Sequence, residues 1–173
     1  VRVSSTDLPP KVYYRLCPEL RNEGRTQAGT PVYVQLLGSD PELMAANARV
    51  DAQLGAPGID LNFGCPAKTV NKSRGGATLL RTPAAIYEVC KAVRDATPPN
   101  IPVTAKVRLG FDDDGQFVDI TNNAFASGIS ELTVHARTKV QAYRPPAHWS
   151  TLRSIHNSGG IPVIANGEIW TPS

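Results

Sequence analysis

Side chains that can bind a ligand or exchange a proton recur along this 173-residue chain, each in or just after a short apolar run. They are Gln35, Asn62 with Cys65, Lys106 with Arg108, His135 with Arg137, and Asn166 with Glu168. The cysteines are widely spaced, and no Cys/His cluster has the spacing of zinc ligands. We therefore predict a site of amide, thiol, imidazole and cationic groups, with no metal.

Lys106 is unusual because it lies within the otherwise apolar run Val103–Arg108. If this run is a strand, Thr104 and Lys106 lie on the same face. Burying a lysine is costly unless its ammonium group meets an anion. That anion is either a bound ligand or a carboxylate of the chain, for which Asp60 and Glu168 are the candidates.

Five apolar runs predict the strands that position these side chains. They are residues 32–37, 59–63, 103–108, 132–135 and 161–165. Helices are predicted between them at residues 41–54, 82–93, 119–127 and 149–156, and the polar segment 7–30 is predicted as an extended loop. Asp40-Pro41 and Thr82-Pro83 are typical helix starts. Alternation of strands and helices implies parallel strands joined by right-handed crossovers.

The distribution of polar residues favours a barrel over an open sheet. Catalytic and binding side chains at the carboxyl end of every strand are typical of a (β/α)₈ barrel. An open sheet concentrates such side chains at one switch point. No GxGxxG motif opens a helix. A whole barrel needs about 250 residues, so five strands together with Val1–Ser4 make roughly two thirds of one. We predict an α/β fold, a partial (β/α)₈ TIM barrel forming one truncated domain over residues 1–173.

Composition excludes several other classes of protein. The chain is 41% hydrophobic and 19% charged with a net charge of +3, and no apolar run reaches the ~20 residues of a membrane span. Three cysteines without a pairing pattern predict a cytoplasmic protein with reduced thiols. The mildly basic charge permits a polyanionic partner without requiring one. The chain starts at Val1 and stops just after Thr171-Pro172, a helix-opening pair, so we expect it to be part of a larger protein.

One segment resembles the signature of a known family. Asp60–Pro66, followed by Arg74–Leu80, resembles the signature of tRNA-dihydrouridine synthases. Four further motifs agree with the family in order: Val34–Gly38, Ala105–Gly110, Val134–Thr138 and Pro162–Glu168. Three stretches are most similar to the bacterial dihydrouridine synthase C branch: Cys65–Asn71, Tyr143-Arg144 and Ala165–Trp170.

The resemblance implies a fold and a reaction. The chain would contain strands 3–7 of the barrel and lack strand 1, most of strand 2, strand 8 and the C-terminal helical domain that grips tRNA. Members of the family use FMN, reduced by NADPH, to saturate the C5=C6 bond of a uridine in tRNA, here a D-loop uridine at position 16. The resemblance also implies a monomer when full length, and a poor catalyst when these 173 residues act alone.

The resemblance further implies a role for each site residue. Cys65 would be the catalytic acid that protonates C5 of the uracil. The FMN-binding residues would be Gln35, Lys106, His135, Asn166, Gly167 and Glu168. The tRNA-binding residues would be Asn62, Arg2, Arg137 and Arg144. The uridine must leave its stack to reach such a site.

Each role has a simpler alternative. Cys65 is also compatible with a small buried residue before a turn, His135 with a hydrogen-bonded core histidine, and Asn166-Gly167 with a plain turn. Each basic residue taken singly is compatible with a solvated surface charge. At the level of function, the alternatives are a flavin barrel dehydrogenase acting on a free pyrimidine, of the dihydroorotate or dihydropyrimidine type, and a non-catalytic RNA-binding partial barrel.

Overall fold

A single parallel sheet organises the chain in the computed structural model, which describes residues 1–3, 8–72, 75–157 and 159–171. Its strands lie side by side in chain order. They are β1 (Val34–Leu36), β2 (Ile59–Asn62), β3 (Val103–Arg108), β4 (Glu131–His135) and β5 (Val163–Asn166). All five predicted strands are therefore confirmed, together with the α/β class and the partial barrel. Ser4 and Arg74, which the sequence predictions include, lie outside the described residues.

The first residues of the chain pair with the edge of this sheet. Arg2 forms a parallel bridge with Leu37, and the Val3 amide donates a hydrogen bond to the Leu37 carbonyl at 2.8 Å. Val1–Val3 thus lie beside the end of β1, as the barrel prediction requires for a preceding strand.

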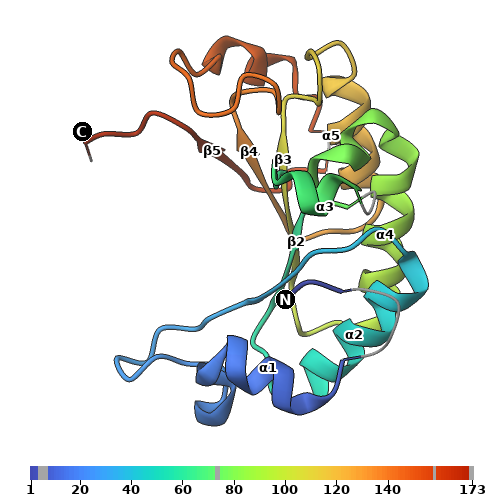
Figure 1. Cartoon of the computed structure of the whole chain (residues 1–173), viewed down its shortest axis with the longest axis vertical. Coiled ribbons are helices and arrows are strands. Elements are labelled where there is room, and N and C mark those ends of the chain that lie inside the picture. The colour runs from blue at the N-terminus through green and yellow to red at the C-terminus, as the bar shows by residue number, and fades with distance from the viewer. Residues whose placement is uncertain (4–7, 73–74, 158, 172–173) are drawn as a thin grey trace.

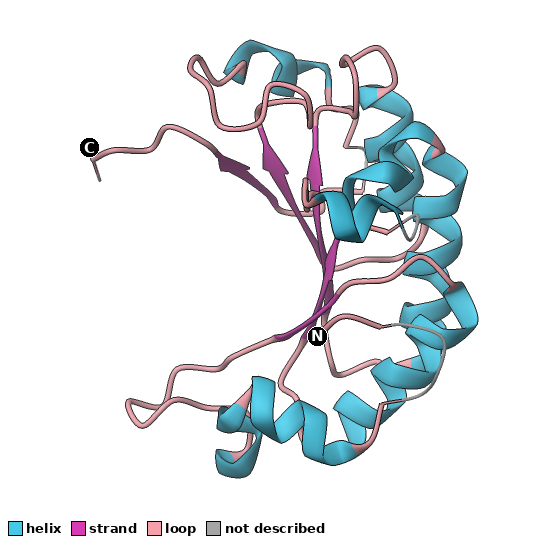
Figure 2. Cartoon of the chain, viewed as in Figure 1, coloured by secondary structure: helices cyan, strands magenta, loops and turns pink. Residues whose placement is uncertain are grey.

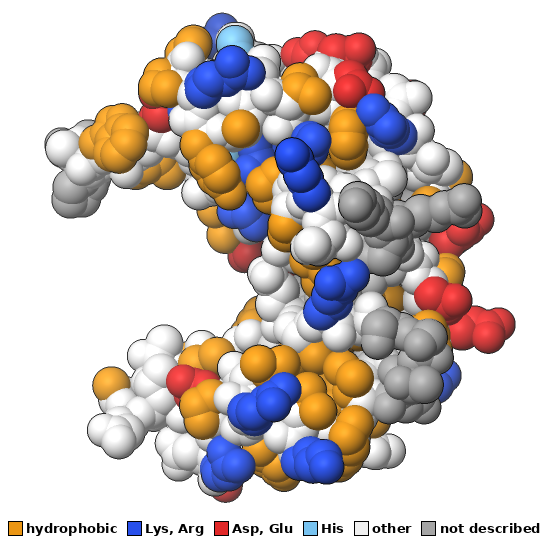
Figure 3. All heavy atoms as spheres, viewed as in Figure 1, with side chains coloured by type: hydrophobic (Ala, Val, Ile, Leu, Met, Phe, Trp, Pro, Cys, Tyr) orange, Lys and Arg blue, Asp and Glu red, His pale blue; other side chains and the backbone are white. Residues whose placement is uncertain are grey.

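Helices cover one face of the sheet and leave the other face open. The long ones are α2 (Pro41–Gln53), α4 (Pro83–Ala96) and α5 (Phe117–Ala126). Figures 1 and 2 show them along the outer side of a curved sheet, and Figure 3 shows the hollow on the inner side. The outer face is apolar because alternate strand residues point toward the helices. The alternate residues Leu36, Ile59, Leu61, Val103, Ala105, Val107, Leu132 and Val134 are all fully buried.

The start of α2 shows why a predicted helix forms where it does. The Asp40 carboxylate accepts hydrogen bonds from the Glu42 and Leu43 amides, both at 3.0 Å, and Pro41 occupies the first helical position. These contacts satisfy amides that the helix itself leaves unpaired. α2 is thereby fixed at the carboxyl end of β1, where the site begins.

Two predictions of local structure differ from the structure. Segment 7–30 is not an extended loop, because it contains α1 (Pro10–Leu16) and the 3₁₀ helix η1 (Pro18–Asn22). The predicted helix at 149–156 is the 3₁₀ helix η3 (Trp149–Ser154). The segment after β2, for which no helix was predicted, contains α3 (Lys68–Lys72) and the 3₁₀ helix η2 (Gly76–Arg81). α1 forms because Tyr13 packs into the core, where its hydroxyl donates a hydrogen bond to Asn47 Oδ1. Among the described residues, no helix is long and apolar enough to cross a membrane.

Candidate functional site

The register of the strands brings most of the predicted site residues onto the inner face of the sheet. Asn62 lies opposite Lys106, and His135 lies between Arg108 and Asn166. These pairings fall at the carboxyl ends of β2 to β5. Figure 3 shows Lys and Arg side chains beside the hollow that this face lines.

A hydrogen-bonded network joins the polar side chains of β1, β2 and β3. Gln35 Nε2 donates to Asp60 Oδ2 at 2.6 Å, and Asn62 Nδ2 donates to Gln35 Oε1 at 2.9 Å. The other carboxylate oxygen, Asp60 Oδ1, accepts from the Thr104 hydroxyl at 2.8 Å. Burial raises the pKa of Asp60, and the hydrogen bonds from Gln35 and Thr104 oppose the rise. The network therefore fixes the Gln35 amide and the Asn62 amide with respect to one another.

Lys106 lies close to this network and points to the opposite side of the site. Its Nζ donates a hydrogen bond to Asn166 Oδ1 at 2.9 Å. Burial lowers the pKa of Lys106, and the nearby Asp60 carboxylate opposes that effect. Within the described part of the chain, Lys106 forms an ion pair with neither Asp60 nor Glu168. Lys106 thus keeps a partly desolvated positive charge whose hydrogen-bond partner is a neutral amide.

The segment that carries Cys65 is held at the mouth of the site by its neighbours. Gly64 donates its amide to Asn62 Oδ1 at 2.9 Å and accepts from Arg108 Nε at 2.8 Å. The Cys65 carbonyl accepts from the Ala77 amide at 3.1 Å. The Cys65 thiol is free and half-buried.

Gly76 allows the backbone to approach Cys65 closely. Its φ is +58°, and a Cβ at this position would lie 2.9 Å from the Cys65 carbonyl oxygen. A larger residue would therefore displace the Cys65 segment. The Arg2 guanidinium donates to the Thr69 carbonyl at 3.2 Å, so Arg2 contacts the segment that follows Cys65.

His135 is buried and uncharged. Burial lowers its pKa to about 4, and the cations Arg108, Arg137 and Lys106 contribute to the same shift. The imidazole packs against the turn after β5, where a Cβ on Gly167 would come within 3.0 Å of its Cδ2 atom. A neutral imidazole can both donate and accept hydrogen bonds.

Arg137 and Glu168 form an ion pair with each other. Arg137 NH2 lies 3.1 Å from Glu168 Oε2, and Arg137 Nε donates to the Arg144 carbonyl at 2.8 Å. The Arg144 side chain is exposed and donates to the Val140 carbonyl at 3.1 Å. Of the two predicted RNA-facing arginines in this loop, Arg144 is the one at the surface.

Arg108 and Tyr143 also belong to the site. The Arg108 guanidinium lies 5.2 Å from the centroid of the Tyr143 ring, and this ring lies 5.9 Å from that of His135. Tyr143 is 68% exposed, although it is large and aromatic. Arg108 was already a candidate beside Lys106 in the sequence, because the two residues share one face of β3, but no role was predicted for it. Tyr143 follows β4 in a loop, where strand alternation gives no signal.

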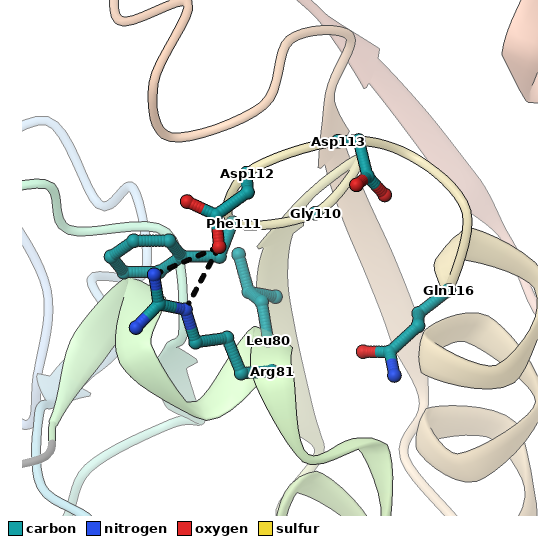
Figure 4. A pocket seen from close by; sticks show the side chains of 7 residues that line it. All are labelled: Leu80, Arg81, Gly110, Phe111, Asp112, Asp113 and Gln116. Carbon is teal, nitrogen blue, oxygen red and sulfur yellow. Dashed lines mark hydrogen bonds and ion pairs between the residues drawn. The ribbon is translucent and has the colours of Figure 1, made fainter.

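The molecule also contains a separate cavity of about 340 Å³. It is lined by Leu80, Arg81, Gly110, Phe111, Asp112, Asp113 and Gln116 (Figure 4). Arg81 pairs with Asp112 at 2.8 Å and its guanidinium lies 3.8 Å from the centroid of the Phe111 ring. None of the predicted site residues lines this cavity.

The sequence matches one protein family over its whole length. Residues 1–173 match the sequence model of the family described as dihydrouridine synthase (Dus). The match therefore includes all five strands of the sheet and every residue of the site described above.

Individual relatives give the same result. The chain is 53% identical over 171 residues to the tRNA-dihydrouridine(16) synthase of Aquipseudomonas alcaligenes, covering 99% of this chain and 54% of that protein. It is 51% identical over 170 residues to that of Shewanella oneidensis and 54% identical over 171 residues to that of Vibrio vulnificus. In both of these cases the match covers 98% of this chain and 54% of the relative. The chain thus spans about half the length of the curated relatives it matches.

Proposed function

Because the chain belongs to the dihydrouridine synthase family, we propose that the protein containing it reduces the C5=C6 bond of a uridine in tRNA, with FMN as cofactor and NADPH as reductant. The observation that carries the proposal is the joint placement of the Cys65 loop, Lys106 and His135 at the carboxyl ends of the strands. We propose a D-loop uridine at position 16, because the relatives are named for that position. This position also agrees with the similarity to the dihydrouridine synthase C branch. A tRNA substrate is consistent with a cytoplasmic protein.

The polar face of the sheet fits a planar cofactor with hydrogen-bonding edges and a negative charge. Lys106 would supply the charge that such a group needs, since its nearest partner is the neutral Asn166 amide. Gln35 would present its amide to a pyrimidine-like edge, and His135 would offer a neutral imidazole. When bound, FMN would supply the hydride for the reduction.

The turn after β5 fits the remainder of the cofactor. Gly167 has a φ of +117°, which favours glycine, and a Cβ at this position would make a tight 3.0 Å contact with His135 Cδ2. Backbone amides beside a glycine bind phosphate oxygens well. Asn166, Gly167 and Glu168 would therefore lie along the ribityl chain and phosphate of FMN.

Cys65 would donate the proton that completes the reduction. Addition of hydride at C6 of uracil leaves negative charge on C5 and the C4 oxygen, so C5 must receive a proton. The half-buried thiol is held at the mouth of the site through Gly64 and Ala77. General acid catalysis of this kind contributes about 10²- to 10⁴-fold to a rate.

The rim of the site fits the RNA. Arg2 and Arg144 are both exposed and would contact phosphates. Asn62, held by Gln35 and Gly64, would face the extruded uracil. Contacts from arginine to phosphate predict that binding weakens as salt is added.

The test uses the full-length protein and tRNA purified from cells that lack dihydrouridine. We expect an oxidised-flavin spectrum as purified, bleaching by NADPH without oxygen, and return of the spectrum on addition of tRNA. Mass spectrometry of digested nucleosides would then detect dihydrouridine. Cys65→Ala should keep the flavin and its reduction by NADPH but slow tRNA reduction about 10²-fold or more.

Cys17→Ser is the matched control, because Cys17 lies between α1 and η1 and contacts Glu19. It should leave tRNA reduction unchanged. A protein that cannot be loaded with FMN would contradict the proposal and favour RNA binding without catalysis. Faster reduction of free uracil or orotate than of tRNA would instead indicate a free-pyrimidine dehydrogenase.

A further inference from the structure

Among the described residues, Arg137 and Glu168 form the least exposed ion pair, and its arginine is buried. The exposed fractions of their side chains are 4% and 21%, whereas both members of the other two pairs are 43% or more exposed. Breaking a buried pair by removing one partner leaves an uncompensated charge inside the protein. Loss of either partner should therefore disturb the two segments that the pair joins, which are the loop after β4 and the turn after β5.

Each guanidinium nitrogen of Arg137 contacts a different part of the molecule. Nε donates to the Arg144 carbonyl at 2.8 Å, NH1 lies 3.1 Å from His135 Nε2, and NH2 lies 3.1 Å from Glu168 Oε2. These contacts leave Arg137 facing the interior. They connect the loop of residues 138–148 to the end of β4 and to the turn after β5.

The turn after β5 is shaped to bring Glu168 back to this loop. Glu168 itself has a φ of +53°, a left-handed conformation that is uncommon for a residue other than glycine. Its Oε2 atom accepts a hydrogen bond from the Ala147 amide as well as the contact from Arg137. One carboxylate oxygen thus holds both the start and the end of the 138–148 loop.

A second arginine holds the middle of the same loop. Arg108 NH1 donates to the Ala142 carbonyl at 2.9 Å and to the Thr138 carbonyl at 3.3 Å. The buried arginines therefore contact the backbone of the loop, while the Tyr143 and Arg144 side chains remain exposed.

We propose that Arg137 and Glu168 are a positioning pair that holds the 138–148 loop, and with it Tyr143 and Arg144, in place for the RNA substrate. The proposal rests on the proposed function and adds to it a role for two side chains that need not touch the substrate. It assigns the Glu168 carboxylate to the loop, while the backbone of the same turn remains available for the cofactor.

The test compares Arg137→Met, Glu168→Ala and the double variant in the full-length protein loaded with FMN. We expect the Ala147 amide to exchange its hydrogen faster in Glu168→Ala, and the loop amides to exchange faster in all three variants. The KM for tRNA should rise more than kcat falls, and kcat/KM should fall about tenfold to a hundredfold, as expected when a group is misplaced by about 1 Å. The double variant should lose no more than Arg137→Met alone, because it leaves no buried charge unpaired.

Asp95→Ala is the matched control, since it removes the exposed pair with Lys91 within α4. It should change neither loop exchange nor the kinetics on tRNA. If Arg137→Met does not fold, Arg137→Lys keeps the charge without the forked guanidinium and should give a smaller effect of the same kind. Unchanged loop exchange, or losses that add in the double variant, would overturn the pairing.

The titration of His135 tests the contact between Arg137 and His135 and requires no tRNA. Arg137 is one of the cations that hold the pKa of His135 near 4. Arg137→Met should therefore raise that pKa, which NMR can follow through the imidazole carbon-bound protons. An unchanged pKa would contradict the contact. Because this readout and loop exchange need no turnover, they test the pair even if the full-length protein proves inactive on tRNA.

Discussion

The two faces of the sheet are made by alternate residues of the same strands and differ in almost every property. On the outer face, Leu61 and Val107 are fully buried under the helices. On the inner face, their chain neighbours Asn62 and Lys106 are polar, partly exposed and hydrogen-bonded to side chains of other strands.

Within a single strand, one set of alternate residues therefore stabilises the fold and the other set forms the site. Apolar burial on the outer face supplies the main favourable free energy of folding. The hydrogen bonds of the inner face have small net effects on stability, since they replace hydrogen bonds to water. They instead fix the directions of the groups that would meet a cofactor. Substitutions on the outer face should therefore lower the free energy of unfolding, whereas substitutions on the inner face should weaken cofactor binding.

The largest effect on stability is expected from the outer face. Leu61→Ala should lower the free energy of unfolding by about 2–5 kcal/mol, because it opens a cavity in a packed core. The measurement is urea-induced unfolding of the full-length protein. Thr133→Ala, on the inner face opposite Lys106, is the control and should cost much less. Equal losses in the two variants would show that the faces do not differ as described.

Lys106→Met tests the inner face, where we expect weaker cofactor binding without a loss of stability. Loss of a charge-assisted contact is worth about 1.5–3 kcal/mol, which corresponds to roughly tenfold to a hundredfold weaker FMN binding. The free energy of unfolding should not fall, because the substitution removes a charge that burial already disfavours. Fluorescence titration with FMN and urea unfolding would measure the two quantities. Unaltered FMN affinity, or a large loss of stability, would show that Lys106 has a structural role.

Sequence patterns were sufficient for the sheet and insufficient for α1. The strands were predictable because four- to six-residue apolar runs stand between clear helix starts such as Asp40-Pro41. α1 and η1 were missed because segment 7–30 is rich in polar residues, although Tyr13 of α1, Cys17 between the two helices and Leu20 of η1 recur at helical spacing and are all buried. A spacing of four and then three residues was the available signal.

Strand alternation explains for which site residues the face of the sheet could be predicted from the sequence. Gln35, Lys106 and His135 lie within strands, so their shared face followed from the register. Arg137 lies beyond the end of β4, where alternation no longer applies, and its prediction as a residue that contacts RNA remains untested. Its direction depends on Glu168, thirty-one positions later in the chain, and no local pattern encodes that contact.

The smallest effect is expected from the exposed ion pair that lines the separate cavity. Arg81 and Asp112 form a 2.8 Å contact, but their side chains are 54% and 59% exposed (Figure 4). Exposed pairs are worth about 0–1 kcal/mol because water screens the charges and the side chains lose freedom. Asp112→Asn should therefore lower the free energy of unfolding by less than about 1 kcal/mol. It should leave FMN affinity and kinetics on tRNA unchanged, whereas Glu168→Ala, which breaks the buried pair, should alter the kinetics. If Asp112→Asn impaired tRNA reduction as strongly as Glu168→Ala, burial would not be what separates the two pairs, and the cavity lined by Asp112 would have to be counted as part of the site.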